Sequence, residues 1–156
     1  MADLESGKLR VIGWREWVSI PPLGIKRIKA KIDTGASSSS LHAYDIEVMD
    51  DLDQQHVQFK IQPLQKNHSV VLQAKVPIHD FRKVKSSNGQ TTIRPVIRTS
   101  IVIFGRKHEI DVTLFDRAKM GFRMLIGREA LRERFVVDSS RSYCAGKLRK
   151  KKKRNG

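Results

Sequence analysis

Asp33-Thr34-Gly35 is the segment of this sequence whose residue types are best suited to catalytic chemistry. It places a carboxylate, a hydroxyl and a glycine next to one another, and Ala36 follows as a further small residue. Glycine lets the backbone turn sharply while another group approaches closely. The alternative is an ordinary turn, because Asp, Thr and Gly are all common turn residues.

A strand must carry this aspartate, since residues 25–32 alternate between apolar and polar side chains and run straight into Asp33. A strand over 10–20 and a turn at 21–24 precede it. Further strands are expected at 43–49, 55–62, 69–76, 91–104 and 108–115, with a short last one beginning at Val136. Only 128–134 is rich in helix formers. The pattern predicts a mainly β fold, a small closed barrel with one short C-terminal helix.

A hairpin is expected at Asn88-Gly89, because both residues tolerate positive φ and β-type segments flank them. It is the strongest short-range hairpin signal in the chain.

Length and composition exclude several classes of protein. The chain of 156 residues suggests one domain, and its longest apolar runs are too short to cross a bilayer. Acidic residues stand near the N-terminus, where a secretory signal needs a basic region, so a cytoplasmic location is expected. The single cysteine, Cys144, excludes an internal disulfide framework and is expected to be an inert thiol.

The charge is concentrated at the C-terminus. Residues 147–154, from Lys147 to Arg154, hold seven of the 31 bases and no acid, which leaves 24 bases against 16 acids, a net +8, in residues 1–146. We expect this tail to be disordered, because like charges repel and nothing apolar can be buried. The tail either binds RNA or ribosomes by electrostatic attraction or serves to keep the protein in solution. The remaining +8 favours an acidic partner or substrate.

Metal and nucleotide motifs are absent from the sequence. No His-Glu-x-x-His occurs, and no two of the five histidines stand four residues apart. No phosphate-binding Gly-x-x-x-x-Gly-Lys-Ser/Thr occurs either. We therefore expect neither a metal site nor a cofactor.

Two blocks of sequence resemble a known family. Residues 31–36, and roughly ninety residues later Met124-Leu125-Ile126-Gly127-Arg128 opening a helix, resemble the two signature blocks of retropepsins, the single-domain aspartic proteases typified by retroviral proteases. A closer resemblance covers almost all of 11–146. Segments 13–18, 23–25, 28–31 and 41–43 are similar to a bacterial family labelled ATP-dependent zinc proteases, which is grouped with retropepsins and associated with glutamate-ligase systems, including one that modifies a ribosomal protein.

The resemblance implies a retropepsin-like barrel over 8–146 and a mechanism based on paired aspartates. Only one Asp-Thr-Gly is present, so a catalytic pair would need Asp33 from two copies of the chain at a two-fold axis. Two adjacent carboxylates share one proton and titrate as a unit. Thr34 would hydrogen-bond to the partner loop, Gly35 would permit close approach, and Ala36 would complete the loop.

Retropepsins also close a β-hairpin flap over the substrate, and the resemblance therefore suggests a role for the predicted hairpin. We expect the flap to turn at Ser87-Asn88-Gly89-Gln90, with a plain surface hairpin as the alternative. The bases near it would make the cleft positive and suited to acidic peptides such as glutamate-rich extensions; they are Lys83, Lys85, Arg94 and Arg98.

The sequence also departs from the retropepsin pattern. Many retroviral enzymes carry an acid where Ser37 stands, and it pairs with the arginine that corresponds to Arg128. Arg128, next to Gly127, is therefore expected to bond to backbone, Glu129 or Glu133. His42 lies just beyond the loop and is expected to be structural. The alternative is that it supports the site residues from outside or contacts the substrate.

Trp14 and Trp17 are expected to lie in the core or at a subunit contact. The favoured hypothesis is a homodimeric aspartic endopeptidase. A non-catalytic module of the same fold that binds ribosomes, RNA or protein through its basic surface is the second hypothesis, and a metal-dependent hydrolase is the third.

Overall fold

The computed structural model describes residues 9–51, 53–64, 69–85, 88–116 and 121–146. These residues form twelve strands, a 3-10 turn and one short helix, which confirms the mainly β prediction. The elements are β1 (Arg10–Ile12), β2 (Arg15–Ile20), η1 (Pro21–Leu23), β3 (Ile25–Ile32), β4 (Ser39–His42), β5 (Tyr44–Asp51), β6 (Gln54–Ile61), β7 (Leu72–Pro77), β8 (Asp80–Lys85), β9 (Thr91–Ile103), β10 (Arg106–Phe115), β11 (Met124–Ile126), α1 (Arg128–Leu131) and β12 (Phe135–Val137).

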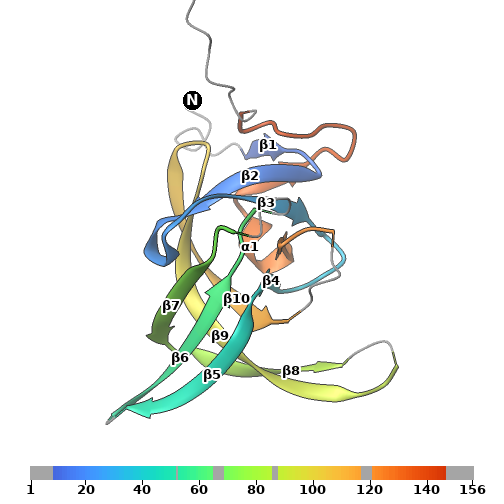
Figure 1. The fold of residues 1–156 in the computed structure, drawn as a ribbon. Coiled ribbons are helices and arrows are strands. Elements are labelled where there is room, and N and C mark those ends of the chain that lie inside the picture. The colour runs from blue at the N-terminus through green and yellow to red at the C-terminus, as the bar shows by residue number, and fades with distance from the viewer. Residues whose placement is uncertain (1–8, 52, 65–68, 86–87, 117–120, 147–156) are drawn as a thin grey trace, which may run out of the picture.

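Six strands close into a barrel, as predicted. Their hydrogen-bonded order is β10-β4-β11-β3-β2-β9, and β9 pairs back to β10. Strand β8 continues the sheet beyond β9 as an arm, and β5, β6 and β7 form a separate three-stranded sheet below the barrel (Figure 1). The short strands β1 and β12 pair in parallel.

Every second residue along the strands points inward, and these side chains fill the barrel interior. Most of them are β-branched or leucine. In β2, for example, Glu16, Val18 and Ile20 are buried while the residues between them are partly exposed. Neither tryptophan lies in this core, since both are only partly buried on the outer side of the fold.

The topology brings the two signature blocks to the same end of the barrel. Strand β11 lies between β3, to which it is parallel, and β4, to which it is antiparallel. Ile126 is in register with Ile32, and the amide of Asp33 donates a hydrogen bond to the carbonyl of Ile126 at 2.8 Å. The ends of β3 and β11 therefore deliver Asp33 and Gly127 side by side, although they are far apart in sequence.

Several expected boundaries were wrong. The strand expected over 10–20 is interrupted at Gly13 and Trp14, because this turn packs against the chain at Arg141. The amide of Trp14 donates to the Arg141 carbonyl at 2.9 Å, and a Cβ at Gly13 would lie 2.4 Å from the same oxygen. The helix expected over 128–134 ends at Leu131, and Glu133 takes a positive φ of 65°.

Strand β4 was missed because the serine-rich segment 37–40 carries no alternating apolar signal. The predicted hairpin is confirmed, since β8 and β9 pair from Asp80↔Val96 to Lys85↔Thr91 around a turn in which Gly89 has a φ of +89°. Ser87 and the tail from Lys147 to Arg154 lie outside the described residues. No helix in the described part of the chain is long and apolar enough to cross a membrane.

Candidate active site

Asp33 lies at the end of β3 in a tight loop, with its side chain partly exposed. The amide of Gly35 donates to Asp33 Oδ1 at 3.0 Å, and the amide of Ala36 donates to the Asp33 carbonyl at 3.2 Å. Thr34 is exposed beside it. The carboxyl group is thus held by its own loop and remains within reach of solvent.

The segment that follows β11 holds this loop in place through backbone hydrogen bonds. The amide of Arg128 donates to the Ala36 carbonyl at 2.8 Å, and the amide of Glu129 donates to the Ser37 carbonyl at 3.0 Å. A Cβ at Gly127 would lie 2.5 Å from the Ser38 carbonyl oxygen. Only glycine fits this contact without displacing the loop.

The side chain of Arg128 hydrogen-bonds to the backbone. This is one of the partners expected for it, because Ser37 replaces the acid that pairs with this arginine in many retroviral enzymes. Its Nη1 donates to the carbonyl of Thr34 at 2.9 Å. Arg128 therefore holds the tip of the Asp33 loop directly, without the carboxylate intermediary expected at position 37. Ser37 is exposed, and its carbonyl accepts the Glu129 amide.

An open depression of about 250 Å³ adjoins the loop tip. Its lining combines Thr34 and Arg128 with apolar and basic side chains from the end of α1 to β12, namely Leu131, Arg132, Phe135 and Val137. The loop thus borders a surface that could accept part of another chain.

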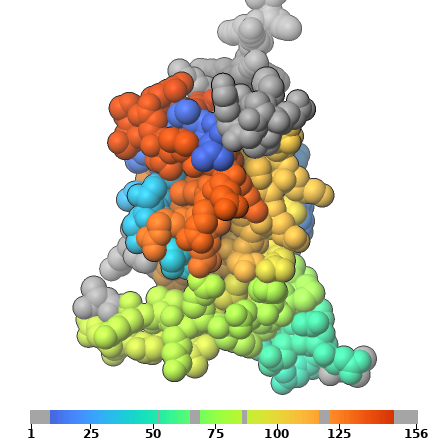
Figure 2. Space-filling view, turned by 180° about the vertical axis from the view of Figure 1, so that it is seen from behind, coloured from blue at the N-terminus to red at the C-terminus, as the bar shows by residue number. Residues whose placement is uncertain are grey.

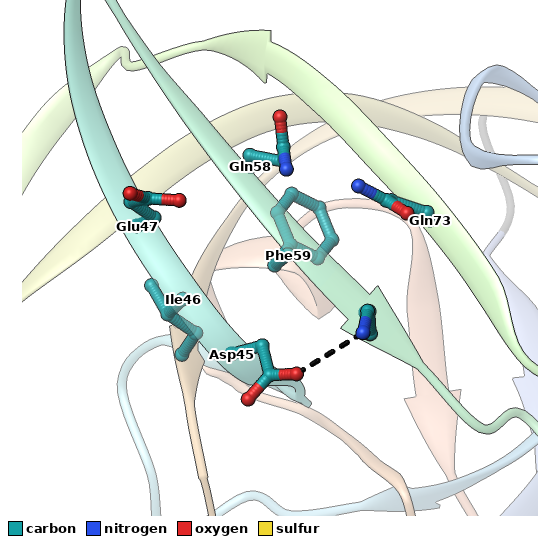
Figure 3. Close-up of a pocket in the computed structure, with 7 residues that line it drawn as sticks. Asp45, Ile46, Glu47, Gln58, Phe59 and Gln73 are labelled. Carbon is teal, nitrogen blue, oxygen red and sulfur yellow. Dashed lines mark ion pairs between the residues drawn. The ribbon is translucent and has the colours of Figure 1, made fainter.

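A larger hollow of about 490 Å³ lies elsewhere, on the three-stranded sheet. Figure 3 shows Phe59 at its centre, with Asp45 and Glu47 along β5. Asp45 forms an ion pair with Lys60 at 3.2 Å. No residue of the Asp33 loop lines it. We therefore assign it no part in chemistry at Asp33.

The β8–β9 hairpin has one side directed at the barrel. Arg82 lies 4.0 Å from Glu129 of α1, and Arg94, its cross-strand partner, lies 4.2 Å from the centre of the Phe115 ring. Figure 2 shows the hairpin, in yellow-green, directly below the orange segment that contains α1. The hairpin base thus lies beside the helix that supports the Asp33 loop.

The bases predicted around this hairpin do not share one face. Lys83 and Lys85 alternate with Arg82 along β8 and so lie on the opposite face from Arg94. Arg98 lies further along β9 and pairs with Asp111 at 2.9 Å. This hydrogen bond from Arg98 lowers the pKa of the Asp111 carboxyl. Arg82 was not foreseen and joins Arg94 instead. At the turn, Asn88 and Gly89 are exposed, and Asn88 Oδ1 accepts the Gln90 amide at 3.1 Å.

His42 lies away from Asp33, at the opposite end of β4 from Ser39. It is 4% exposed, stacks on Tyr44, and its Nδ1 lies 3.9 Å from Asp116. Burial lowers its pKa, with a further contribution from Arg123, and Asp116 opposes the shift. These contacts are those of a structural histidine.

Two residues whose side chains hold backbone segments in place were not predicted from the sequence. The hydroxyl of Ser39 accepts the amide of Gly127 at 3.1 Å. The fully buried Glu16 accepts amides from Gly13 at 2.7 Å, Cys144 at 2.8 Å and Ala145 at 3.0 Å. Nothing local in the sequence marks either role, because the partners are mostly far away along the chain.

No three His, Cys, Asp or Glu side chains among the described residues are grouped so that they could hold a metal ion. The geometry at the loop is instead that of a carboxylate presented by a hydrogen-bonded turn.

Comparison with known proteins gives three findings. The family model described as RimB-like, retropepsin-like aspartic endopeptidase RimB, matches residues 11–148. Proteins named probable alpha-L-glutamate ligase are similar over most of this chain, with 40% identity over 87% of it in Shewanella pealeana and 38% over 90% in Desulfotalea psychrophila. The chain spans only 30% of the length of these relatives.

The third finding is a solved structure of a Legionella pneumophila protein of unknown function. It matches 87% of this chain and 98% of its own with a TM-score of 0.73 and 23% identity. At this identity the match shows a common fold.

Proposed function

Because the chain belongs to the RimB-like family of retropepsin-like aspartic endopeptidases, we propose that it is an aspartic endopeptidase that works as a homodimer. The observation that carries the proposal is the partly exposed carboxyl of Asp33, held by Gly35 and by a loop that Gly127 and Arg128 support. This is a partly exposed aspartate, held by hydrogen bonds, in a chain whose family is described as an aspartic endopeptidase.

In the proposed mechanism, Asp33 carboxyl groups of two copies share one proton. Two like charges at short range cannot both ionise at low cost, so one carboxyl is kept protonated. The ionised carboxylate takes a proton from water as the water oxygen attacks the peptide carbonyl, and the protonated carboxyl donates to the carbonyl oxygen. Thr34, exposed at the loop tip, would bond across the two-fold axis to the partner loop.

The β8–β9 hairpin is proposed as the flap that covers the bound peptide. Its base contacts α1 through Arg82 and Glu129, and its turn at Asn88 and Gly89 is exposed. Ser87 belongs to the same proposal by sequence alone. Arg82 and Arg94 share the face of the hairpin that is directed at the barrel, so they are the bases best placed to meet the substrate.

An acidic, glutamate-rich peptide is proposed as substrate. The chain carries a net charge of +15, Arg128 contacts the Asp33 loop, and Arg82 and Arg94 lie on the barrel-facing side of the hairpin. The relatives are named as probable glutamate ligases, and a domain like this chain accounts for 30% of their length. We propose a cytoplasmic setting, with contact to ribosomes or nucleic acid through the tail from Lys147 to Arg154.

The test is cleavage of a fluorogenic glutamate-rich peptide by the wild-type protein and by Asp33→Asn. Loss of the acid–base group should lower the cleavage rate by about 10²–10⁴-fold. The control is Asp53→Asn, which makes the same change at an exposed turn aspartate and should leave the rate unchanged. Equal rates for Asp33→Asn and wild type would contradict the proposal.

The pairing of two chains is tested by mixing. If both aspartates are needed, an equal mixture of Asp33→Asn and wild type, after subunit exchange, should retain about one quarter of the wild-type activity, because only that share of dimers has both carboxyl groups. Retention of about half would show that each chain acts alone.

A further inference from the structure

Six side chains on the outer surface form a closed ring of aromatic groups and cations, which we call the aromatic–cation cluster. Its members are Trp14, Arg15, Trp17, Lys29, Phe122 and Tyr143. We propose that this cluster binds single-stranded nucleic acid, with bases stacked on its rings and phosphates on its cations. The inference goes beyond the peptidase activity and does not depend on it.

The contacts run continuously around the ring. The Arg15 guanidinium lies 4.6 Å from the Trp14 ring centre and 4.8 Å from that of Tyr143. Tyr143 stacks on Trp17, with ring centres 6.1 Å apart and planes 16° apart. Every member of this set is partly exposed, so the surface is preformed and open to a ligand.

Lysine 29 closes the ring on its other side. Its ammonium lies 5.5 Å from the Trp17 ring centre and 5.9 Å from that of Phe122, which itself contacts Trp14 edge-on at 6.0 Å. In the described part of the chain, neither Arg15 nor Lys29 has a carboxylate partner. Within these residues the two cations contact ring faces, which do not neutralise their charge, so the charge is available to an anion.

A row of further bases continues from the cluster along β3. Arg27 and Lys31 flank Lys29 at alternate positions and are exposed. Alternate residues of a strand lie on one face roughly 6.6 Å apart. A regular line of cations suits a polymer that carries one negative charge per nucleotide.

The C-terminal part of the described chain packs next to the cluster. The amide of Tyr143 donates to the Arg15 carbonyl at 2.9 Å, and Glu16 holds the amides of Cys144 and Ala145. This C-terminal segment therefore lies beside β1 and β2 (Figure 1). The described chain ends there at Gly146, and the sequence continues with the seven bases of 147–154.

The rings favour nucleic acid over an acidic peptide as the occupant. Stacking on an aromatic ring is available to every base, independent of sequence, whereas glutamate and aspartate side chains have no ring to stack. Cations interleaved with aromatic rings are the combination that single-strand-binding proteins use. The cluster also adjoins the end of β3, since the backbone carbonyl of Trp14 accepts the amide of Ile32 at 2.8 Å, so a bound strand would lie near the residue that precedes Asp33.

The test is binding of a fluorescein-labelled oligouridylate of about 12 nucleotides to the full chain, followed by anisotropy. Trp17→Leu should weaken binding by roughly tenfold, the effect of losing one stacking ring. Lys29→Gln should weaken it and lower the slope of log affinity against log salt by about 0.7. Lys107→Gln, which removes an exposed lysine on β10, is the matched control for a change in general charge.

Three further measurements make the outcome decisive. Circular dichroism confirms that the variants are folded, and Asp33→Asn should bind the oligonucleotide as wild type does, which separates this inference from the peptidase proposal. If Trp17→Leu and Lys29→Gln bind no more weakly than Lys107→Gln, the oligonucleotide binds elsewhere on the chain and the inference is overturned. It is also overturned if a glutamate peptide binds at the cluster and oligouridylate does not.

Discussion

The backbone amide of Gly127 donates a hydrogen bond to the hydroxyl of Ser39 at 3.1 Å, across a sequence separation of 88 residues. Both residues are buried. The bond joins the start of β4 to the residue that precedes α1, directly behind the Asp33 loop. The geometry of the aspartate therefore depends on a serine that takes no part in the proposed chemistry.

Removal of this hydroxyl should destabilise the protein. In Ser39→Ala the Gly127 amide loses its partner in the interior, at a cost of about 1–3 kcal/mol in the free energy of unfolding. Urea denaturation measures it. Ser37→Ala is the matched control, because Ser37 is exposed and the bond it accepts, from the amide of Glu129, is to its backbone carbonyl. If both variants unfold at the same urea concentration, the hydrogen bond contributes nothing.

Gly127→Ala should be more disruptive than a glycine substitution elsewhere. The new methyl would meet the Ser38 carbonyl at 2.5 Å and the Ala36 carbonyl at 2.9 Å, so the Asp33 loop must move. We expect a loss of about 1–3 kcal/mol in stability together with reduced peptide cleavage. Gly121→Ala, where no atom of the described residues lies within 4 Å of the added Cβ, serves as comparison in thermal unfolding and activity assays. An active, fully stable Gly127→Ala protein would show that the loop tolerates displacement.

Glu16→Gln should also lower the free energy of unfolding. The two carboxylate oxygens accept three backbone amides, and an amide nitrogen in place of either oxygen would set donor against donor. The expected loss is about 1–3 kcal/mol, by denaturant unfolding. It should come with increased hydrogen exchange at Cys144 and Ala145. Glu47→Gln, at an exposed position, should have neither effect.

The stability of the protein should fall as the pH is lowered below about 6.5. Burial lowers the pKa of His42 and that of His108 below the ordinary 6.5, so the unfolded chain takes up protons that the folded chain refuses. The stability contributed by these groups is complete above pH 6.5 and is lost as the pH falls towards their folded-state pKa values.

Each group contributes a slope of at most about 1.4 kcal/mol per pH unit in that window. The slope should be shallower in His42→Phe and in His108→Phe, and shallowest in the double variant. Urea unfolding at a series of pH values between 5 and 7.5 measures it. Unchanged slopes in all three variants would mean that other groups govern the acid response.

Several elements of the fold could be predicted from local patterns in the sequence. Apolar alternation predicted β3 over its observed bounds, because a strand buried on one face must repeat every two residues. Asn88-Gly89 predicted the β8–β9 hairpin, since turn chemistry is local. The resemblance of two short blocks to retropepsins predicted roles for Asp33 and Gly127, and these two residues lie side by side in the structure.

Only the tertiary structure determined which groups hold the Asp33 loop and which side chains meet in the aromatic–cation cluster. The partner of Arg128 is a carbonyl 94 residues away, Glu16 binds amides 128 and 129 residues away, and Tyr143 completes a ring with Trp17 from the opposite end of the chain. Patterns of two or four residues report only neighbours along the chain. Hydrogen bonds and ring contacts between distant segments exist only once β11 has inserted between β3 and β4 and the barrel has closed, so no local pattern encodes them.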